Sequence, residues 1–154
     1  MAKSRLPVFV IAIASVTASA REGTPEETLH YYVSIQPSRG DVFSQGKLDG
    51  VDYRTLLRGA VVYDSASLAE IFRYTATGHL IGAGAEDNSA ILHALLHYWG
   101  DSRFSAVLRK QSAPVRRAVI AALDYSWRYP GWKSHEFPMT YRLAKHQKIA
   151  ISPP

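Results

Sequence analysis

The stretch GDSRFSAVLRKQSAPVRRAVIAALDY, residues 100–125, decides the fold because it is punctuated as two consecutive helices. Gly100 ends whatever helix precedes it, and Asp101 can begin the first of the two. Ser112 precedes the second helix, which has Pro114 in its first turn, where a missing amide hydrogen does no harm. Apolar residues recur every three or four positions in both helices: Phe104, Val107 and Leu108, then Val115, Ala118, Val119, Ala122 and Leu123. The stretch therefore predicts two antiparallel helices, each with one buried face.

The same residues resemble a known kind of repeat. A Gly-Asp start, a first helix, a turn with proline and a second helix written VRRAVIAAL resemble a HEAT-type helical repeat. A helix predicted over residues 88–99 could be the second helix of an earlier unit, so the resemblance covers residues 88–125. It implies stacked antiparallel helix pairs and a protein-binding role, and it carries no catalytic residue. Roughly three stacked units are needed to bury such faces, so we expect further helices upstream.

Residues 52–78 supply those further helices. Asp52 can cap a short helix that we expect to end at Gly59, and the apolar run after it fits either a strand or a continued helix. Asp64 or Ser65 can cap the next helix, which Gly78 ends. The predicted fold is thus mostly α-helical: stacked antiparallel helix pairs arranged as a short α-solenoid or an orthogonal bundle.

The first twenty residues have the pattern of a signal peptide. Lys3 and Arg5 precede an apolar run at residues 6–16, and the small residues 18–20 would form the cleavage site. An uncleaved anchor or a buried helix is the alternative, but the run is short against the roughly 20 residues that span a bilayer. We expect a secreted or periplasmic protein with no stable membrane span after cleavage.

The remaining segments divide the chain around the helices. We expect residues 21–50 to be an irregular N-terminal segment with a short strand possible at residues 29–35, and residues 51–154 to form the helical domain. The C-terminal tail is rich in aromatic residues and proline, which favours a cap over the end of the helical core. Its alternative role is an exposed anchor for a partner, formed by Trp127, Tyr129 and Trp132.

Composition excludes several kinds of chemistry. The chain has 154 residues, of which 47% are hydrophobic and 20% charged, as expected for one folded domain. It contains no cysteine, which excludes thiolate nucleophiles, Cys-ligated zinc and iron–sulfur clusters. Removal of Lys3 and Arg5 with the signal peptide would lower the formal charge from +5 to +3. So small an excess argues against nucleic-acid binding.

The stretch ILHALLHYW, residues 91–99, raises the question of a metal site. On a helix, His93 and His97 lie one turn apart on the side opposite Leu95, and we expect them on the polar stripe. Ala94 follows His93 where a zinc hydrolase motif requires glutamate. We therefore predict no metal site, while keeping four candidate ligands for one: His79, Glu86, His93 and His97.

No catalytic or cofactor signature is complete. A nucleophile elbow is missing, and the glycine-rich residues 78–87 lack the third glycine of a dinucleotide fingerprint, so we expect no cofactor. We therefore favour binding over catalysis and keep catalysis as the alternative. If a cleft forms, its candidate groups are His79, Asp87, His135 and Glu136.

A basic helix face points instead to binding. Arg103, Arg109, Arg116 and Arg117 fall in the helix pair, and they indicate either an acidic partner or a solvated surface. We expect an exported helical protein that binds another, unidentified protein as a binding module or accessory factor. The expected contact residues are Arg116, Arg117, Trp127, Tyr129 and Trp132. The alternative function is a small envelope hydrolase or metal-binding protein that uses His79, Glu86, His93 and His97.

Overall fold

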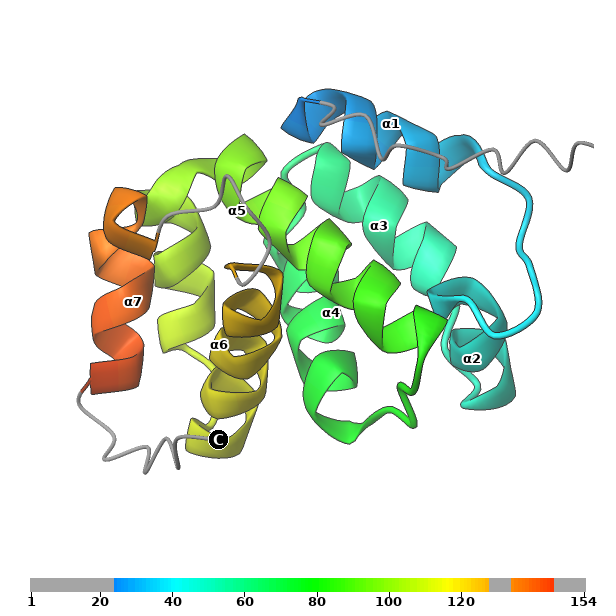
Figure 1. Cartoon of the computed structure of the whole chain (residues 1–154). Coiled ribbons are helices and arrows are strands. Elements are labelled where there is room, and N and C mark those ends of the chain that lie inside the picture. Colours follow the sequence, from blue (N-terminus) through cyan, green and yellow to red (C-terminus); the bar gives the residue numbers. More distant parts are fainter. Residues whose placement is uncertain (1–23, 128–133, 146–154) are drawn as a thin grey trace, which may run out of the picture.

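The computed structural model describes residues 24–127 and 134–145, and these residues form helices joined by turns (Figure 1). In chain order the helices are α1 (Pro25–Ser34), α2 (Val42–Leu48), α3 (Tyr53–Val61), α4 (Ser65–Thr77), α5 (Ala83–Arg109), α6 (Ala113–Trp127), the short 3-10 helix η1 (Ser134–Glu136) and α7 (Pro138–Lys145). No strand occurs in this part of the chain. The prediction of a mostly α-helical fold made of packed helix pairs is confirmed.

Helix α5 is the central element and consists of two helices joined at Gly100. Gly100 has φ +72° and ψ 153°, a conformation that glycine adopts far more readily than other residues. The helix therefore ends at Gly100, as predicted, and a second one runs over residues 101–109 in a different direction (Figure 1). This break lets one long segment contact both ends of the molecule.

The predicted pair over residues 100–125 is present. The second part of α5 packs along α6, and α6 buries Val115, Val119 and Leu123. Helix α4 covers the pair from the other side, where Phe72 meets Phe104 edge to face with ring centroids 4.9 Å apart. The apolar spacing read from the sequence thus identified the buried face correctly.

Helices α3 and α4 form another pair, begun by the two aspartates expected to cap them. Asp52 accepts a hydrogen bond from the Thr55 amide at 3.0 Å, and Asp64 accepts one from the Ser67 amide at 3.1 Å. Helix α3 continues past Gly59 to Val61, so the expected end was two residues early. A Cβ on Gly59 would lie 2.2 Å from Ser67 Oγ, which explains glycine inside this helix.

The expectation of an irregular segment with a strand over residues 21–50 is wrong where the structure describes it. Helix α1 spans residues 25–34 and α2 spans residues 42–48. Thr24 and Glu27 form a reciprocal capping box, and Leu29 is buried against the core. Burial of that one helical face outweighs the strand preference of the Tyr-Tyr-Val run.

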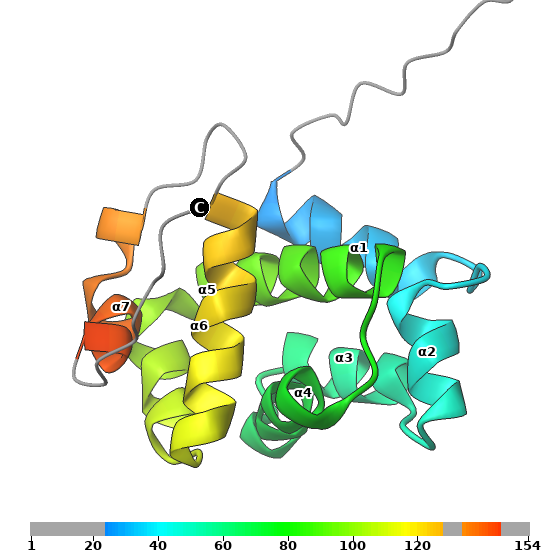
Figure 2. The same cartoon turned by 60° about the horizontal axis from the view of Figure 1, so that its bottom comes forward.

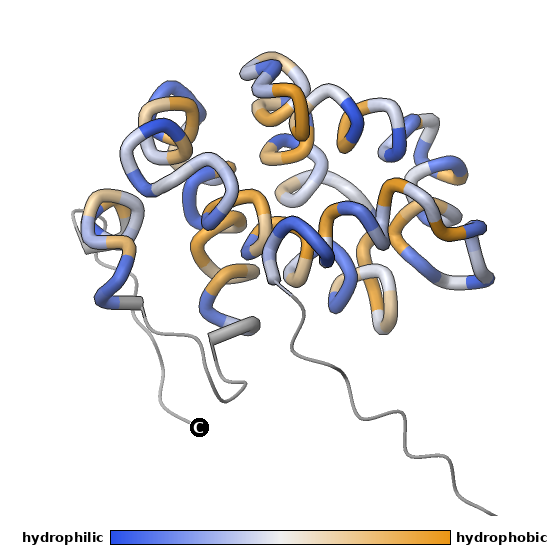
Figure 3. The backbone as a smooth tube through the Cα atoms, turned by 90° about the horizontal axis from the view of Figure 1, so that it is seen from above, coloured by the Kyte–Doolittle hydropathy of each residue, from blue (hydrophilic) through white to orange (hydrophobic). Residues whose placement is uncertain are grey.

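The core is continuous and lies between the two ends of the molecule. Its largest fully buried side chains are Tyr53, Phe72, Phe104, Leu57, Leu68, Ile71, Ile91, Leu92, Leu95, Leu96, Leu108 and Leu123. Hydrophobic and hydrophilic stretches alternate along the helices, as in amphipathic helices (Figure 3). Figures 1 and 2 place α2 at one end and α7 at the other. Within the described residues, no helix combines the length and apolarity needed to cross a membrane.

Candidate functional site

Charge is distributed unevenly between the two parts of the chain that meet at Gly100. Residues 24–100 contain five Lys or Arg and nine Asp or Glu, whereas the described residues 101–127 and 134–145 contain seven Lys or Arg and three Asp or Glu. The second part of α5, α6 and α7 lie together (Figure 2), so the excess of cations is collected in one region. We call this region the basic end and define it by Arg109, Lys110, Arg116, Arg117 and Arg142.

The cations of the basic end differ in what they contact. Arg116 Nη1 donates to the Gln111 carbonyl oxygen at 2.5 Å and so joins the start of α6 to the end of α5. Arg109, Lys110, Arg117 and Arg142 are exposed, and no described carboxylate pairs with any of them. Of the two arginines predicted to bind a partner, Arg117 is exposed and Arg116 is partly committed to structure. Arg103, which the sequence also placed on the basic helix face, lies over the Tyr63 ring, with its guanidinium carbon 5.4 Å from the ring centroid.

A cavity of about 280 Å³ opens between α5 and α7 in the basic end. Its lining consists of Arg109, Met139, Arg142 and Leu143, so two guanidinium groups accompany two apolar side chains. Asp101 positions α7 beside it by accepting the Met139 amide at 2.6 Å and the Thr140 amide at 2.7 Å. The start of the second part of α5 therefore fixes one wall of this cavity.

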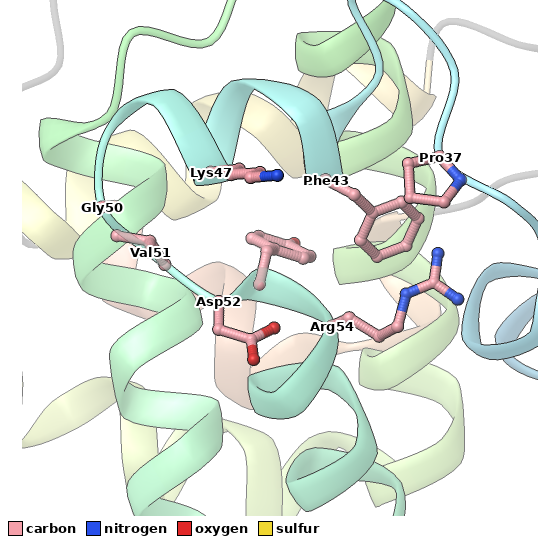
Figure 4. Close-up of a pocket in the computed structure, with 8 residues that line it drawn as sticks. Pro37, Phe43, Lys47, Gly50, Val51, Asp52 and Arg54 are labelled. Atoms are coloured by element: carbon pink, nitrogen blue, oxygen red, sulfur yellow. The ribbon is translucent and has the colours of Figure 1, made fainter.

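A larger cavity of about 460 Å³ lies at the opposite end, between α2 and α3 (Figure 4). Its lining residues are Pro37, Phe43, Lys47, Gly50, Val51, Asp52, Tyr53 and Arg54. Figure 4 shows Lys47 on the α2 side and Arg54 on the α3 side. The Arg54 guanidinium stacks 4.6 Å from the centroid of the Phe43 ring. The volume lies within the range of small-molecule pockets, which is about 300–1,000 Å³.

The two histidines of α5 are not on a polar stripe, so that prediction is wrong. His93 is 1% exposed, and its ring centroid lies 4.9 Å from that of His97. Phe137 approaches both rings edge-on, with centroid distances of 6.3 Å to His93 and 4.5 Å to His97. The segment that carries Phe137 covers the face of α5 that contains His93 and His97. Without this segment, that face would be exposed to solvent.

Burial controls the protonation of this histidine pair. Removal from water lowers the pKa of His93 to about 3, and the neighbouring His97 adds to that effect. Burial also lowers the pKa of His97, while Glu136 and Glu26 act in the opposite direction. Both imidazoles are therefore neutral near pH 7, which is the form that ligates metal.

The structure does not assemble the four candidate metal ligands. His79 contacts Asp49 of the α2–α3 turn, and Glu86 lies 3.5 Å from the Tyr125 hydroxyl of α6. Across residues 24–127 and 134–145, no three His, Asp or Glu side chains are grouped closely enough to hold a metal ion. His93 and His97 remain a pair of neighbouring imidazoles without a described third ligand.

His79 is instead the exposed member of a hydrogen-bonded cluster with Asp49 and Tyr74. Its Nδ1 lies 2.8 Å from Asp49 Oδ1, and its amide donates to Asp49 Oδ2 at 3.0 Å. Tyr74 donates to the same carboxylate at 2.8 Å. These hydrogen bonds, led by the one from the His79 backbone, lower the pKa of Asp49. The carboxylate orients an imidazole whose side chain is 90% exposed.

The other candidate catalytic groups are dispersed. Asp87 accepts a hydrogen bond from Tyr32 at 2.9 Å and one from the Val42 amide at 3.3 Å, and thereby joins α1 and α2 to α5. Burial raises the pKa of Asp87. His135 and Glu136 are exposed on η1. None of these three residues lines either cavity, and neither does His79.

The predicted aromatic anchor lies largely outside the described part of the chain. Tyr129 and Trp132 fall outside the described residues, and Trp127 is described only as the last residue of α6. Phe137 is the described aromatic residue of the tail that packs into the core, with 6% of its surface exposed.

Sequence reasoning missed Arg142 and Met139 at the basic end and Lys47 and Phe43 in the larger cavity. The signal for α7 was present, because Pro138 precedes an amphipathic stretch, but nothing local indicated that Asp101 would cap it.

The chain matches no known protein family, and no curated protein or solved structure shows significant similarity to it.

Proposed function

We propose that this chain is an exported binding module that contacts an acidic surface of another protein with its basic end. The observation that carries the proposal is a set of four exposed cations that have no described carboxylate partner: Arg109, Lys110, Arg117 and Arg142. Two of them, Arg109 and Arg142, line a cavity together with Met139 and Leu143. The pattern of residues 1–20 supports export.

The cavity gives the basic end apolar contact surface in addition to its positive charge. Arginine forms paired hydrogen bonds with carboxylates, and two arginines here line the cavity together with Met139, which is 40% exposed. An acidic residue of a partner could meet the guanidinium groups while an adjacent apolar side chain contacts Met139 and Leu143. Charge then steers the encounter, and the apolar contact supplies part of the affinity.

A protein partner fits better than a nucleic acid. Residues 24–100 carry more carboxylates than cations, and those would repel a phosphate backbone that extended beyond the basic end. The apolar side chains of the cavity lining, Met139 and Leu143, also have no use in phosphate binding. We therefore expect an interface that is confined to the basic end and to one acidic protein surface.

Site-specific photo-cross-linking in the native host tests the proposal. A benzophenone side chain replaces Met139 in one variant and Ala66, an exposed residue of α4, in a second. We expect a specific protein adduct from position 139 and none from position 66. Adducts from both positions, or from neither, would contradict the proposal.

Charge reversal shows whether the adduct depends on the basic end. In the Arg109→Glu/Arg142→Glu variant the adduct should disappear, whereas Arg58→Glu, an exposed reversal on α3, should leave it unchanged. Loss of the adduct in both variants, or a nuclease-sensitive adduct, would count against a protein partner that recognises this end.

Export is tested separately from binding. N-terminal sequencing of the protein recovered outside the cytoplasm should find Arg21 as the first residue. An intact Met1 on that protein would overturn the cleaved signal peptide and leave the binding proposal standing.

The second candidate function is hydrolysis by a small envelope enzyme. The contact of Asp49 with His79 Nδ1 favours it, since a carboxylate in that position orients an imidazole as a general base. A chromogenic ester assay should then show turnover that both His79→Gln and Asp49→Asn reduce. Equal rates of ester hydrolysis by the protein and its His79→Gln variant would contradict this second function.

A further inference from the structure

The segment that carries Phe137 and α7 covers a pair of neighbouring imidazoles on α5. His93 is 1% exposed, and the His97 ring lies beside it, with 4.9 Å between the two centroids. The Phe137 ring meets both imidazoles edge-on, and its own exposed fraction is only 6%. Hydration of His93 on this side therefore requires that Phe137 moves.

Phe137 is joined to α7, so such a movement would disturb the basic end. The Tyr141 amide donates to the Phe137 carbonyl oxygen at 2.9 Å, and this hydrogen bond begins α7. Helix α7 then supplies three of the four residues that line the cavity of the basic end: Met139, Arg142 and Leu143. One short segment thus covers the histidine pair and forms most of the proposed binding site.

The contact of α7 with the core contains an unfavourable group. Thr140 is buried, and its hydroxyl oxygen has no hydrogen-bond partner among the described residues, which costs free energy relative to the hydrated group. The two hydrogen bonds to Asp101 fix the first turn of the helix. An eight-residue helix attached in this way can open locally, because local opening requires less free energy than unfolding of the whole core.

Protonation favours this opening. Burial, with a contribution from the neighbouring His97, lowers the pKa of His93 to about 3, and burial also lowers the pKa of His97. The charged groups that act on the pair are Glu136 of η1 and Glu26 of α1, which favour protonated His97 without offsetting its burial. Within the described residues, α6 and α7 place no charged group close enough to act on either ring. Below pH about 6.5 the opened form therefore binds protons that the closed form excludes.

We propose that this histidine pair makes the basic end sensitive to acid. Protonation of His93 and His97 displaces Phe137, releases η1 and α7, and so withdraws most of the cavity lining from the partner. The inference rests on the proposed function, because its consequence for binding requires that the basic end contacts a partner. The histidines themselves do not line the cavity, so the effect is transmitted through α7.

Hydrogen exchange of the full chain tests the opening without the partner. Protection factors, corrected for the intrinsic pH dependence of exchange, are measured at pH 7.5, 6.0 and 4.5. For the α7 amides we expect protection to fall about a hundredfold between pH 7.5 and 4.5 through His93 alone, because the opened form takes up its proton. This exchange should be nearly independent of about 1 M urea, whereas exchange in α4 requires global unfolding and should depend on urea. Equal protection and equal urea dependence in α7 and α4 would overturn the proposal.

Histidine replacements separate protonation from packing. In His93→Gln/His97→Gln, uncharged polar side chains replace the imidazoles, and α7 should keep its protection at pH 4.5 within about twofold of that at pH 7.5. His30→Gln, a matched change of an exposed histidine on α1, should retain the full decrease. If the double variant does not fold, Phe137→Ala removes the cover instead, and α7 should then be poorly protected at every pH. Unchanged pH dependence in the double variant, or full protection in Phe137→Ala, would overturn the proposal.

The photo-adduct from position 139 shows whether opening ends binding. Its yield at pH 4.5 should fall at least about fivefold below that at pH 7.5, and should change by no more than about twofold in His93→Gln/His97→Gln. An adduct that persists at pH 4.5 while α7 is open would overturn the inference and leave the proposed function standing. Absence of the adduct at both pH values would contradict the proposed function itself, and with it this regulation, whatever the exchange of α7.

Discussion

His93 shows how the surroundings of a residue, and not its place on a helix, decide its chemistry. On an isolated α5 it would face water opposite Leu95, yet Phe137 and His97 enclose it. Its environment favours the neutral imidazole, so its pKa falls to about 3. A residue that looked like a ligand for metal is therefore part of the contact between α5 and the C-terminal segment.

The depressed pKa of His93 predicts a loss of stability in acid. The unfolded chain binds a proton near the ordinary value of about 6.5, whereas the folded chain binds it only near pH 3. The stabilisation is therefore complete above pH about 6.5 and is lost as the pH falls towards 3, by up to about 1.4 kcal/mol per pH unit. Urea unfolding at a series of pH values measures it.

The variant His93→Leu isolates this contribution. Its free energy of unfolding should decline less steeply between pH 6.5 and 3, about the range that the pKa of His93 defines. Identical slopes for the two proteins would show that His93 does not titrate differently on unfolding.

At the scale of elements, one residue separates the two parts of α5. Gly100 takes a conformation in which side chains are strained, so Gly100→Ala should lower the free energy of unfolding by about 1–2 kcal/mol. Ser102→Ala, an exposed change two residues away, should stay within about 0.5 kcal/mol of the original. Urea denaturation compares them, and equal stability of Gly100→Ala would mean that the break does not depend on glycine.

Helix α7 depends on a cap supplied from another helix. Asp101 accepts the amides of Met139 and Thr140, so Asp101→Ala should cost about 1 kcal/mol and increase hydrogen exchange along α7. Asp101→Asn keeps one of the two side-chain acceptor oxygens and should restore part of the protection. If exchange along α7 is unchanged in Asp101→Ala, the cap does not hold this wall of the basic cavity.

Local signals in the sequence predicted most of the helices. Asp52, Asp64 and Gly100 act at helix ends as expected, because capping and left-handed turns depend on neighbouring residues. The missed helix α1 had its own signal, since Thr24 and Glu27 have the spacing of a capping box. Its strand-like residues outweighed that signal in the prediction.

At the scale of the whole molecule, the sites could not be read from the sequence because distant segments build them. Each cavity draws its lining from two helices, and the burial of His93 depends on Phe137, more than 40 residues away. Periodicity identifies the apolar face of one helix and cannot show which polar face a later segment will cover. The HEAT-type resemblance correctly indicated paired helices, while its repeat geometry stays a prediction.

If the basic end binds the partner as proposed, the division of charge at Gly100 predicts that this binding depends on salt concentration. An interface dominated by Arg109 and Arg142 should weaken as ionic strength rises, because exposed charges are screened over about 8 Å in 0.15 M salt. The association rate should change more than the dissociation rate. Surface plasmon resonance with the partner that cross-linking at position 139 identifies measures both rates. Rates that do not change with salt would contradict an electrostatic interface.

The affinity of that partner for the Arg109→Glu/Arg142→Glu variant tests the central proposal most directly. We predict binding at least about tenfold weaker than to the original chain, since two favourable charge contacts become repulsive. Circular dichroism should show that the variant remains folded, because both side chains are exposed. A folded variant that binds the partner with unchanged affinity would show that the basic end is a solvated surface and not the binding site.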